Sequence, residues 1–420
     1  MTDAEFFDAC KKVLKRELVP AMGCTEPIAI AYASALARDA LGEEVVSAEA
    51  VLSRNIIKNV KSVIVPHTGG LKGIAAAIAV GVVAGVAEKK LEAISDVTQE
   101  QIDALPEYME RVPVAIFCSE SPFVFDLTVF LRGVKHWSRV RIVGKHTNVV
   151  SVERDGLSLH SGEIAETSER SDAVLTVEGI LRFASQLSEE EGAELFGDQI
   201  ELNMRIAEEG LRGDYGANIG KTLLSVGGTY CKERAYAAAA SDARMSGCEL
   251  PVVINSGSGN QGITSSVPVI VYARSHGISD LMLYRALAVS NLVTIHLKTG
   301  IGTLSAYCGA IAAGVGCAAG IAFLVDNTFR TVAHTIVNAV AINSGVICDG
   351  AKPSCAAKIA SAIDAGLLGM EMILHGNQFY GGDGIVRKGV ENTIAAIGCL
   401  AHDGMDGTDR EIIRLMTEDC

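Results

Sequence analysis

The spacing of apolar residues predicts two helices at the start of the chain. Over residues 3–18, apolar side chains recur at roughly helical spacing. Pro20 ends this helix, because proline cannot continue helical hydrogen bonding. A second, more apolar helix is predicted from Glu26 to about Leu41, with Pro27 in its first turn and Gly42 directly after its end.

Short runs rich in Val, Ile and Phe follow, and such runs are typical of β-strands. They predict strands at residues 45–52, 112–118, 123–131, 140–143 and 149–152. A helix of small residues is predicted over 74–86, and Asp155-Gly156 is a turn signal beside the last strand. We therefore expect a sheet of four or five strands in this part of the chain.

From about residue 187 onward, strand signals nearly vanish and Ala, Gly and aliphatic residues dominate. A helix is predicted over 189–211. Three later stretches carry no Asp, Glu, Lys or Arg, namely 250–273, 299–325 and 331–348. Helices so poor in charge are buried on all sides. The expected fold is α+β, with a mixed region at residues 1–180 packed on a larger, Ala/Gly-rich, all-α domain at residues 181–420.

A membrane span has to be considered for residues 306–325, which are twenty residues without charge. Gly316 and Gly320 form a small-xxx-small pair of the kind found between membrane helices. However, Ala and Gly drive insertion far less than Leu, Ile or Phe, and no basic cluster flanks the stretch. We favour a helix buried in a soluble core. If the protein is not an enzyme, the alternative is a small-molecule transporter or binding protein.

Composition and charge narrow the class of protein. The 420 residues are 49% hydrophobic and 20% charged, against about 25% charged residues in ordinary globular proteins, which excludes a disordered chain. The net charge of −14 argues against nucleic acid as a partner. The polar start predicts no secretory signal, so we expect a cytoplasmic protein with reduced thiols. Its eleven cysteines then serve metal binding, catalysis or core packing.

Three cysteines in the helical half form a candidate metal site. Cys308 lies in an Ala/Gly-rich stretch, and Cys348 and Cys355 flank a loop that contains glycine and proline. A loop lets two thiolates converge, and Cys thiolates hold iron–sulfur clusters. Lys352 and Lys358 favour the thiolate form. The alternative is that each thiol is a small buried hydrophobic group.

Two other segments suggest binding of a small anion and a reactive thiol. Residues 256–262 form a Gly/Ser-rich stretch whose backbone N–H groups and hydroxyls suit a carboxylate, although a simple turn explains it as well. Its candidate binding residues are Ser256, Ser258, Asn260 and Gln261. Cys24 lies just before a predicted helix, where the helix N-terminus lowers the pKa of a thiol.

Six segments together resemble a known family. They are AMGCTEPIAIA, SRNIIKNVKSVIVPHTGG, LRGDYGANIGKTL, INSGSGNQGITSSVPV, LSAYCGAIAAGVG and ICDGAKPSCAAK. In this order they resemble the L-cysteine desulfidase family, also called cysteine desulfhydrase, which is related to the α chain of the iron–sulfur L-serine dehydratases. The resemblance implies β-elimination of L-cysteine to sulfide, pyruvate and ammonia without PLP. L-Serine dehydration is the nearest alternative.

The resemblance also implies roles for individual residues. Cys308, Cys348 and Cys355 would hold a 4Fe–4S cluster with one open iron, which is closed at rest by water, Cys24 or Cys420. Cys24 is a candidate base or cluster-proximal thiol, and His67 a candidate base or substrate contact. The remaining candidate contacts to the substrate are Asn55, Lys58, Asn59 and Lys352. We expect a small-molecule substrate, no nucleic acid, no membrane partner, and consider a homodimer as the assembly.

Overall fold

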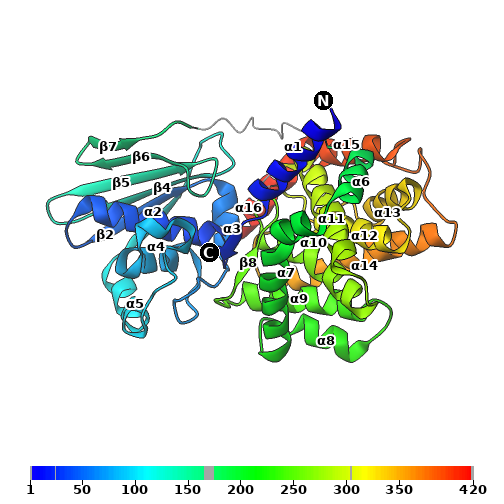
Figure 1. Ribbon diagram of the computed structural model, residues 1–420. Helices are drawn as coiled ribbons and strands as arrows, with labels where there is room; N and C mark the ends of the chain where they lie inside the picture. The colour runs from blue at the N-terminus through cyan, green and yellow to red at the C-terminus, as the bar shows by residue number, and fades with distance from the viewer. Residues whose placement is uncertain (1, 24, 165–174, 303–304, 418–420) are drawn as a thin grey trace.

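The computed structural model describes residues 2–23, 25–164, 175–302 and 305–417 (Figure 1). A smaller part built around a sheet lies beside a larger helical part, which confirms the α+β prediction. Each part has its own hydrophobic core. One core draws on residues between 28 and 142, and the other combines residues 6–21 with residues 175–401. The division near residue 180 stays a prediction, and the structure places the first helix with the second core.

In the described part of the chain, the main sheet has six strands. They are β2 (Ser47–Leu52), β3 (Val114–Cys118), β4 (Asp126–Arg132), β5 (Trp137–Val143), β6 (Val149–Arg154) and β7 (Leu157–Ser161). The spatial order is β3-β2-β4-β5-β6-β7, and all pairs are antiparallel except β2–β3. Alternate residues of β2, β4 and β5 are buried, because α2 (Thr25–Leu41) covers that face, and α4 (Gly73–Ala84) packs on α2.

The prediction of four or five strands was too low, because β7 was missed. Its side chains are exposed along the whole strand, and Leu157 is 71% exposed. A strand without a buried face has no alternation for a sequence pattern to detect. The turn that leads into it was predicted correctly, since Asp155 and Gly156 both have positive φ angles.

The other helices are divided between the two parts (Figure 1). In the first half of the chain they are α1 (Asp3–Glu17), α3 (Arg54–Val60), the 3-10 helix η1 (Ala87–Glu92) and α5 (Gln99–Arg111). The helical part contains α6 (Val177–Gln186), α7 (Glu189–Arg212), α8 (Ile219–Val226), α9 (Cys231–Met245), α10 (Gly259–Ser275), α11 (Asp280–Ile301), α12 (Gly309–Val325), α13 (Phe329–Ile342), α14 (Cys355–Leu374), α15 (Val390–Cys399), the π turn η2 (Leu400–Gly404) and α16 (Asp406–Thr417).

The uncharged stretch at residues 306–325 forms α12, which lies among α10, α11, α13 and α14. Its glycines allow close packing on α11. A Cβ on Gly316 would lie 2.1 Å from Oγ1 of Thr294, and one on Gly320 would lie 2.8 Å from the carbonyl oxygen of Ala286. None of the described helices has both the length and the apolar character needed to cross a membrane.

The Gly/Ser-rich stretch at residues 256–262 is a shorter loop than predicted. Asn255 and Ser258 exchange two backbone hydrogen bonds around a tight turn, in which Ser256 has a φ of 49° and Gly257 a φ of 77°. Helix α10 then begins at Gly259. Asn260 and Gln261 therefore belong to the first turn of a helix, where backbone N–H groups lack helical acceptors.

Two connections hold the two parts together. Strand β1 (Pro20–Met22), which pairs antiparallel with β8 (Pro251–Val253) of the helical part, also contacts η1 and α2 of the sheet part. Helix α16 returns to α3 of the sheet part, and the Nζ of Lys58 forms an ion pair with Asp409 at 2.5 Å. Helix α1 belongs to the helical part, where Phe6 is buried.

Helix α7 offers a matched test of this packing. A Cβ on Gly210 would lie 2.0 Å from the carbonyl oxygen of Ala239 in α9, whereas one on Gly197 would meet no atom within 4 Å. We expect Gly210→Ala to destabilise the protein by about 1–3 kcal/mol through overpacking. Gly197→Ala should stabilise it by about 0.5–1 kcal/mol, because alanine favours a helix over glycine. Urea unfolding measures both, and equal effects would contradict the α7–α9 contact.

Candidate active site

The structure brings the three predicted cluster cysteines together. The backbone N–H of Cys308 donates to Val346 at 3.0 Å, and that of Cys348 donates to Ala306 at 2.6 Å. This short antiparallel pairing places the thiols of Cys308 and Cys348 within hydrogen-bonding reach. Cys355, the first residue of α14, interacts electrostatically with both. A site predicted from separate stretches of sequence is therefore contiguous in space.

Three helices begin at this place. Cys308 is the N-cap residue of α12, Cys355 opens α14, and Ser258 is the N-cap residue of α10. The start of α10 touches that of α12, because a Cβ on Gly309 would lie 2.7 Å from Cδ of Gln261. Helix N-termini carry partial positive charge, so all three favour thiolates and other anions here.

Two buried lysines add full positive charges. Lys298 of α11 is 6% exposed, and its Nζ donates to the carbonyl oxygen of Gly302 at 2.6 Å. Burial lowers the pKa of Lys298 to about 8, and the neighbouring Cys348 and Cys308 thiols oppose this shift. The hydrogen bond from Cys308 lowers the pKa of Cys348, and the charge of the buried Lys58 adds to this effect.

The loop between Cys348 and Cys355 carries its own ion pairs. Lys352 and Lys358 both pair with the carboxylate of Asp349. Burial raises the pKa of Asp349, but the hydrogen bonds from these two lysines bring it down to about 2. Lys352 also partly offsets the rise in the pKa of Cys355 that burial causes. Lys352, predicted as a substrate contact, therefore lies beside the cysteines and already has a carboxylate partner.

The four predicted anion-binding side chains differ in whether they form hydrogen bonds within the protein. The hydroxyl of Ser256 donates to Asn255 at 2.8 Å, and Oδ1 of Asn260 accepts from Arg244 at 3.2 Å. The Ser258 side chain makes no capping hydrogen bond to α10. Oε1 of Gln261 is buried, and no described group donates to it.

The candidates from the first part of the chain reach this region from α2 and α3. Cys24 lies outside the described residues. Its neighbour Thr25 donates to the carbonyl oxygen of Gly257 at 3.5 Å, so the start of α2 meets the turn before α10. Nδ2 of Asn59 donates to Glu26 at 2.9 Å, and Oδ1 of Asn55 is buried without a partner among the described residues.

His67 adopts a φ of 55° in the segment between α3 and α4. Its Nδ1 lies 3.0 Å from the carboxylate of Glu249, and its Nε2 is buried without a described partner. The described contacts of His67 do not link it to the three cysteines. Its catalytic role therefore stays a prediction.

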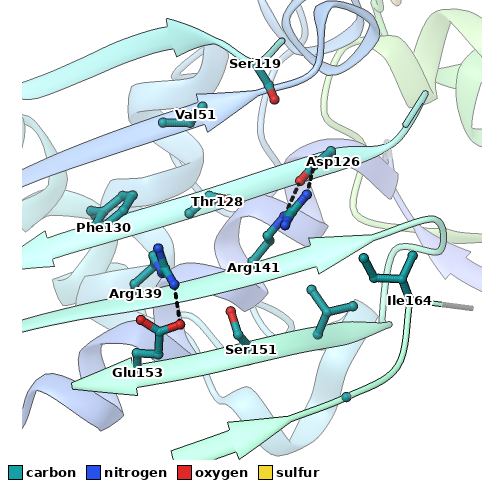
Figure 2. Close-up of a pocket in the computed structure, with 12 residues that line it drawn as sticks. Val51, Ser119, Asp126, Thr128, Phe130, Arg139, Arg141, Ser151, Glu153 and Ile164 are labelled. Atoms are coloured by element: carbon teal, nitrogen blue, oxygen red, sulfur yellow. Dashed lines mark hydrogen bonds and ion pairs between the residues drawn. The ribbon is translucent and has the colours of Figure 1, made fainter. Parts of the chain in front are cut away.

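A separate pocket lies on the face of the sheet opposite α2 (Figure 2). It contains two arginine–carboxylate pairs. Arg141 contacts Asp126 through two hydrogen bonds, of 3.0 and 2.7 Å, and Arg139 pairs with Glu153. None of the residues predicted from the sequence to form the site lines it. The cysteine region is the candidate active site for this reason.

Sequence reasoning missed three buried charged residues near the cysteine region: Asp242, Arg244 and Lys298. Asp242 and Arg244 lie in α9, just after four consecutive alanines and Ser241, and Lys298 ends a run of uncharged residues that begins at Ala286 in α11. A charged residue in an apolar helical stretch is the signal that could have found them, because buried charges are costly without a partner.

Residues 88–414 match the family model of the serine dehydratase alpha chain. The chain belongs to this family. It is a lyase-type family of iron–sulfur serine dehydratase subunits. The matched range contains the three cysteines and the turn before α10. It does not contain Cys24, Asn55, Lys58, Asn59 or His67, so the match leaves their roles untested.

Several relatives match nearly the whole chain. A UPF0597 protein of Desulfitobacterium hafniense is 51% identical over 420 residues, which cover 99% of this chain and 98% of the relative. A UPF0597 protein of Lachnoclostridium phytofermentans is 47% identical, and the match covers 96% of this chain and 98% of the relative. A UPF0597 protein of Treponema denticola is 43% identical, and the match covers 97% of each chain. These names specify no substrate, and cysteine specificity stays a proposal.

The residues present fit the iron–sulfur cluster that the serine dehydratase alpha chain family implies. Three free thiols lie together among helix N-termini and lysines, as a cluster of thiolate ligands requires. Among the described residues, no three His, Cys, Asp or Glu side chains are arranged to hold a single metal ion. In a cluster, cysteines bind different irons, so they need not converge on one point.

The raised pKa of the buried Asp242 carboxyl group provides a test of the electrostatics around this site. Its Oδ2 accepts from the N–H of Gly220 at 3.1 Å, and burial raises its pKa to about 6. Since this pKa lies above the ordinary aspartate value of 3.8, the contribution of Asp242 to stability is complete below about pH 4 and is lost as the pH rises through 6. Asp242→Asn removes the charge and keeps an acceptor for Gly220. We expect the wild type to lose stability relative to this variant between pH 4 and 7 in urea unfolding. A difference independent of pH would refute the shifted pKa.

Proposed function

We propose that the protein is an iron–sulfur-dependent, PLP-independent L-cysteine desulfidase that releases sulfide, pyruvate and ammonia. The proposal rests on the observation that Cys308, Cys348 and Cys355 lie together beside the start of α10. Membership of the serine dehydratase alpha chain family supports the lyase chemistry. The resemblance of the sequence segments to cysteine desulfidases supports the substrate.

In this proposal, Cys308, Cys348 and Cys355 hold a 4Fe–4S cluster. Lewis acidity toward the β-thiol of the substrate would come from an open iron of that cluster. The protein contributes the electrostatic surroundings. The charge on Nζ of Lys298 and the N-termini of α12 and α14 offset the negative charge of the three thiolates.

In this proposal, backbone and side-chain groups of the protein bind the substrate and remove its Cα proton. The first-turn N–H groups of α10 offer donors to one end of a small amino acid. We assign removal of the Cα proton to Cys24 or His67, the two candidate bases named from the sequence. Burial of Cys308 and Gln261 limits the access of water to the elimination.

L-Serine dehydration is the second candidate, because the matching family is named for serine dehydratase. It requires the same removal of a Cα proton and differs in the leaving group, hydroxide in place of sulfide. A non-enzymatic transporter has less support, since the described helices include none able to cross a membrane.

The cysteines provide the test of the cofactor. Protein purified without oxygen should contain about four irons per chain. We expect Cys308→Ser, Cys348→Ser and Cys355→Ser each to lose most of this iron and the activity. Cys317→Ala is the matched control, because Cys317 is fully buried in α12 and burial raises its pKa well above the ordinary value. Full activity in iron-free wild-type protein would overturn the proposal.

The substrate is decided by product analysis. With L-cysteine and no added PLP, we expect sulfide, pyruvate and ammonia in equal amounts, with a kcat/KM at least about tenfold above that for L-serine. A soft thiolate is a better ligand for iron than a hydroxyl group, which is the reason for this preference. A higher kcat/KM for L-serine would establish the second candidate instead.

A further inference from the structure

Arg244 is a buried arginine that has no carboxylate partner among the described residues. It lies in α9 and is 4% exposed, and no acidic side chain among the described residues forms an ion pair with it. Its Nη1 donates to Oδ1 of Asn260 at 3.2 Å, and no described group accepts a hydrogen bond from its Nε.

Three other arginines of the protein each have a carboxylate partner. Figure 2 shows Arg141 held by both oxygens of Asp126 and Arg139 paired with Glu153. In α9 itself, Arg234 pairs with Asp364 at 2.7 Å. An arginine side chain carries its charge at any physiological pH. A buried charge of this kind needs an anion from elsewhere.

The guanidinium of Arg244 packs against Gly259, the first residue of α10. A Cβ on Gly259 would lie 2.3 Å from Nε and 2.7 Å from Cζ of Arg244, so only glycine leaves room for this contact. Helix α10 is 17 residues long, and its N-cap side chain makes no hydrogen bond to the first turn. The charged group and the helix N-terminus therefore lie against each other, and both present N–H donors suited to an anion.

The first turn of α10 also contacts the start of α12. Gln261, in this turn, packs on Gly309, the residue after Cys308, and its Oε1 is buried without a described donor. One turn of α10 therefore touches both Arg244 and the residue next to Cys308.

We propose that Arg244 and the N-terminus of α10 bind the carboxylate of the amino-acid substrate. The substrate's identity rests on the proposed function, whereas binding of a carboxylate does not. Arginine matches a carboxylate with two parallel N–H groups, a geometry that lysine lacks. The carboxylate supplies the missing charge, and the rest of the amino acid extends toward Cys308.

The first experiment measures binding without turnover. L-Alanine has the carboxylate and amine of the substrate but no β-leaving group, and ethylamine lacks the carboxylate. By isothermal titration calorimetry on the anaerobic holoprotein, we expect wild type to bind L-alanine at least about tenfold more tightly than ethylamine, the usual scale for charged hydrogen bonds. Arg244→Lys should remove this preference. Equal binding of L-alanine by wild type and Arg244→Lys would overturn the proposal, whether or not the protein acts on cysteine.

Two variants separate binding from structure. Gly259→Ala keeps the arginine but pushes the guanidinium away from α10, so it should weaken L-alanine binding as Arg244→Lys does. Arg234→Lys, in the same helix, should leave binding unchanged because Arg234 has its own carboxylate. If the enzyme acts on L-cysteine, Arg244→Lys and Gly259→Ala should raise KM by about tenfold or more and change kcat less. Unaltered KM in both variants would refute the role of Arg244 while leaving the desulfidase activity in place.

Discussion

Buried thiolates need positive charge close by, and the arrangement of the helical part follows from this requirement. Helices α10, α12 and α14 begin near one another, so the partial charges of three N-termini add at one place. Lys298 and Lys58 contribute full charges from α11 and α3. The backbone pairing of residues 306–308 with 346–348 then holds Cys308 against Cys348 inside this positive region.

Close backbone packing makes this convergence possible. Gly309 allows Gln261 to lie against the start of α12, and Gly259 does the same for Arg244 at the start of α10. Gly350, with a φ of 93°, admits the carbonyl oxygen of Lys58, so the loop between Cys348 and Cys355 packs on α3 of the sheet part. The sheet part therefore does more than support the helices, because its α3 supplies charge next to the cysteines.

A network of buried amides fixes the turn before α10. Asn255 donates to Oδ1 of Asn291 at 2.9 Å, and Gln199 and Asn291 exchange two hydrogen bonds of 3.1 and 2.9 Å. Ser265 donates to the same Oδ1 of Asn291 at 3.0 Å. Every one of these side chains is buried, and leaving one unsatisfied would be costly. The network holds Ser256 in a left-handed conformation that a free loop would rarely adopt.

Local patterns in the sequence predicted the α+β class, most of the strands, and the helices at 3–17 and 25–41 closely, because periodicity and proline act within a few residues. The same local reasoning singled out the three cysteines as candidates, and the resemblance to a family joined them into one site. It missed β7, which has no buried face, and it predicted a loop where Asn260 and Gln261 begin α10. Arg244, Asp242 and Lys298 were also missed, since their burial depends on helices far away in the chain. Only the tertiary structure could bring three helix N-termini and a buried arginine to one place, because the contacts that make this arrangement join residues far apart in the chain and leave little trace in any single stretch of sequence.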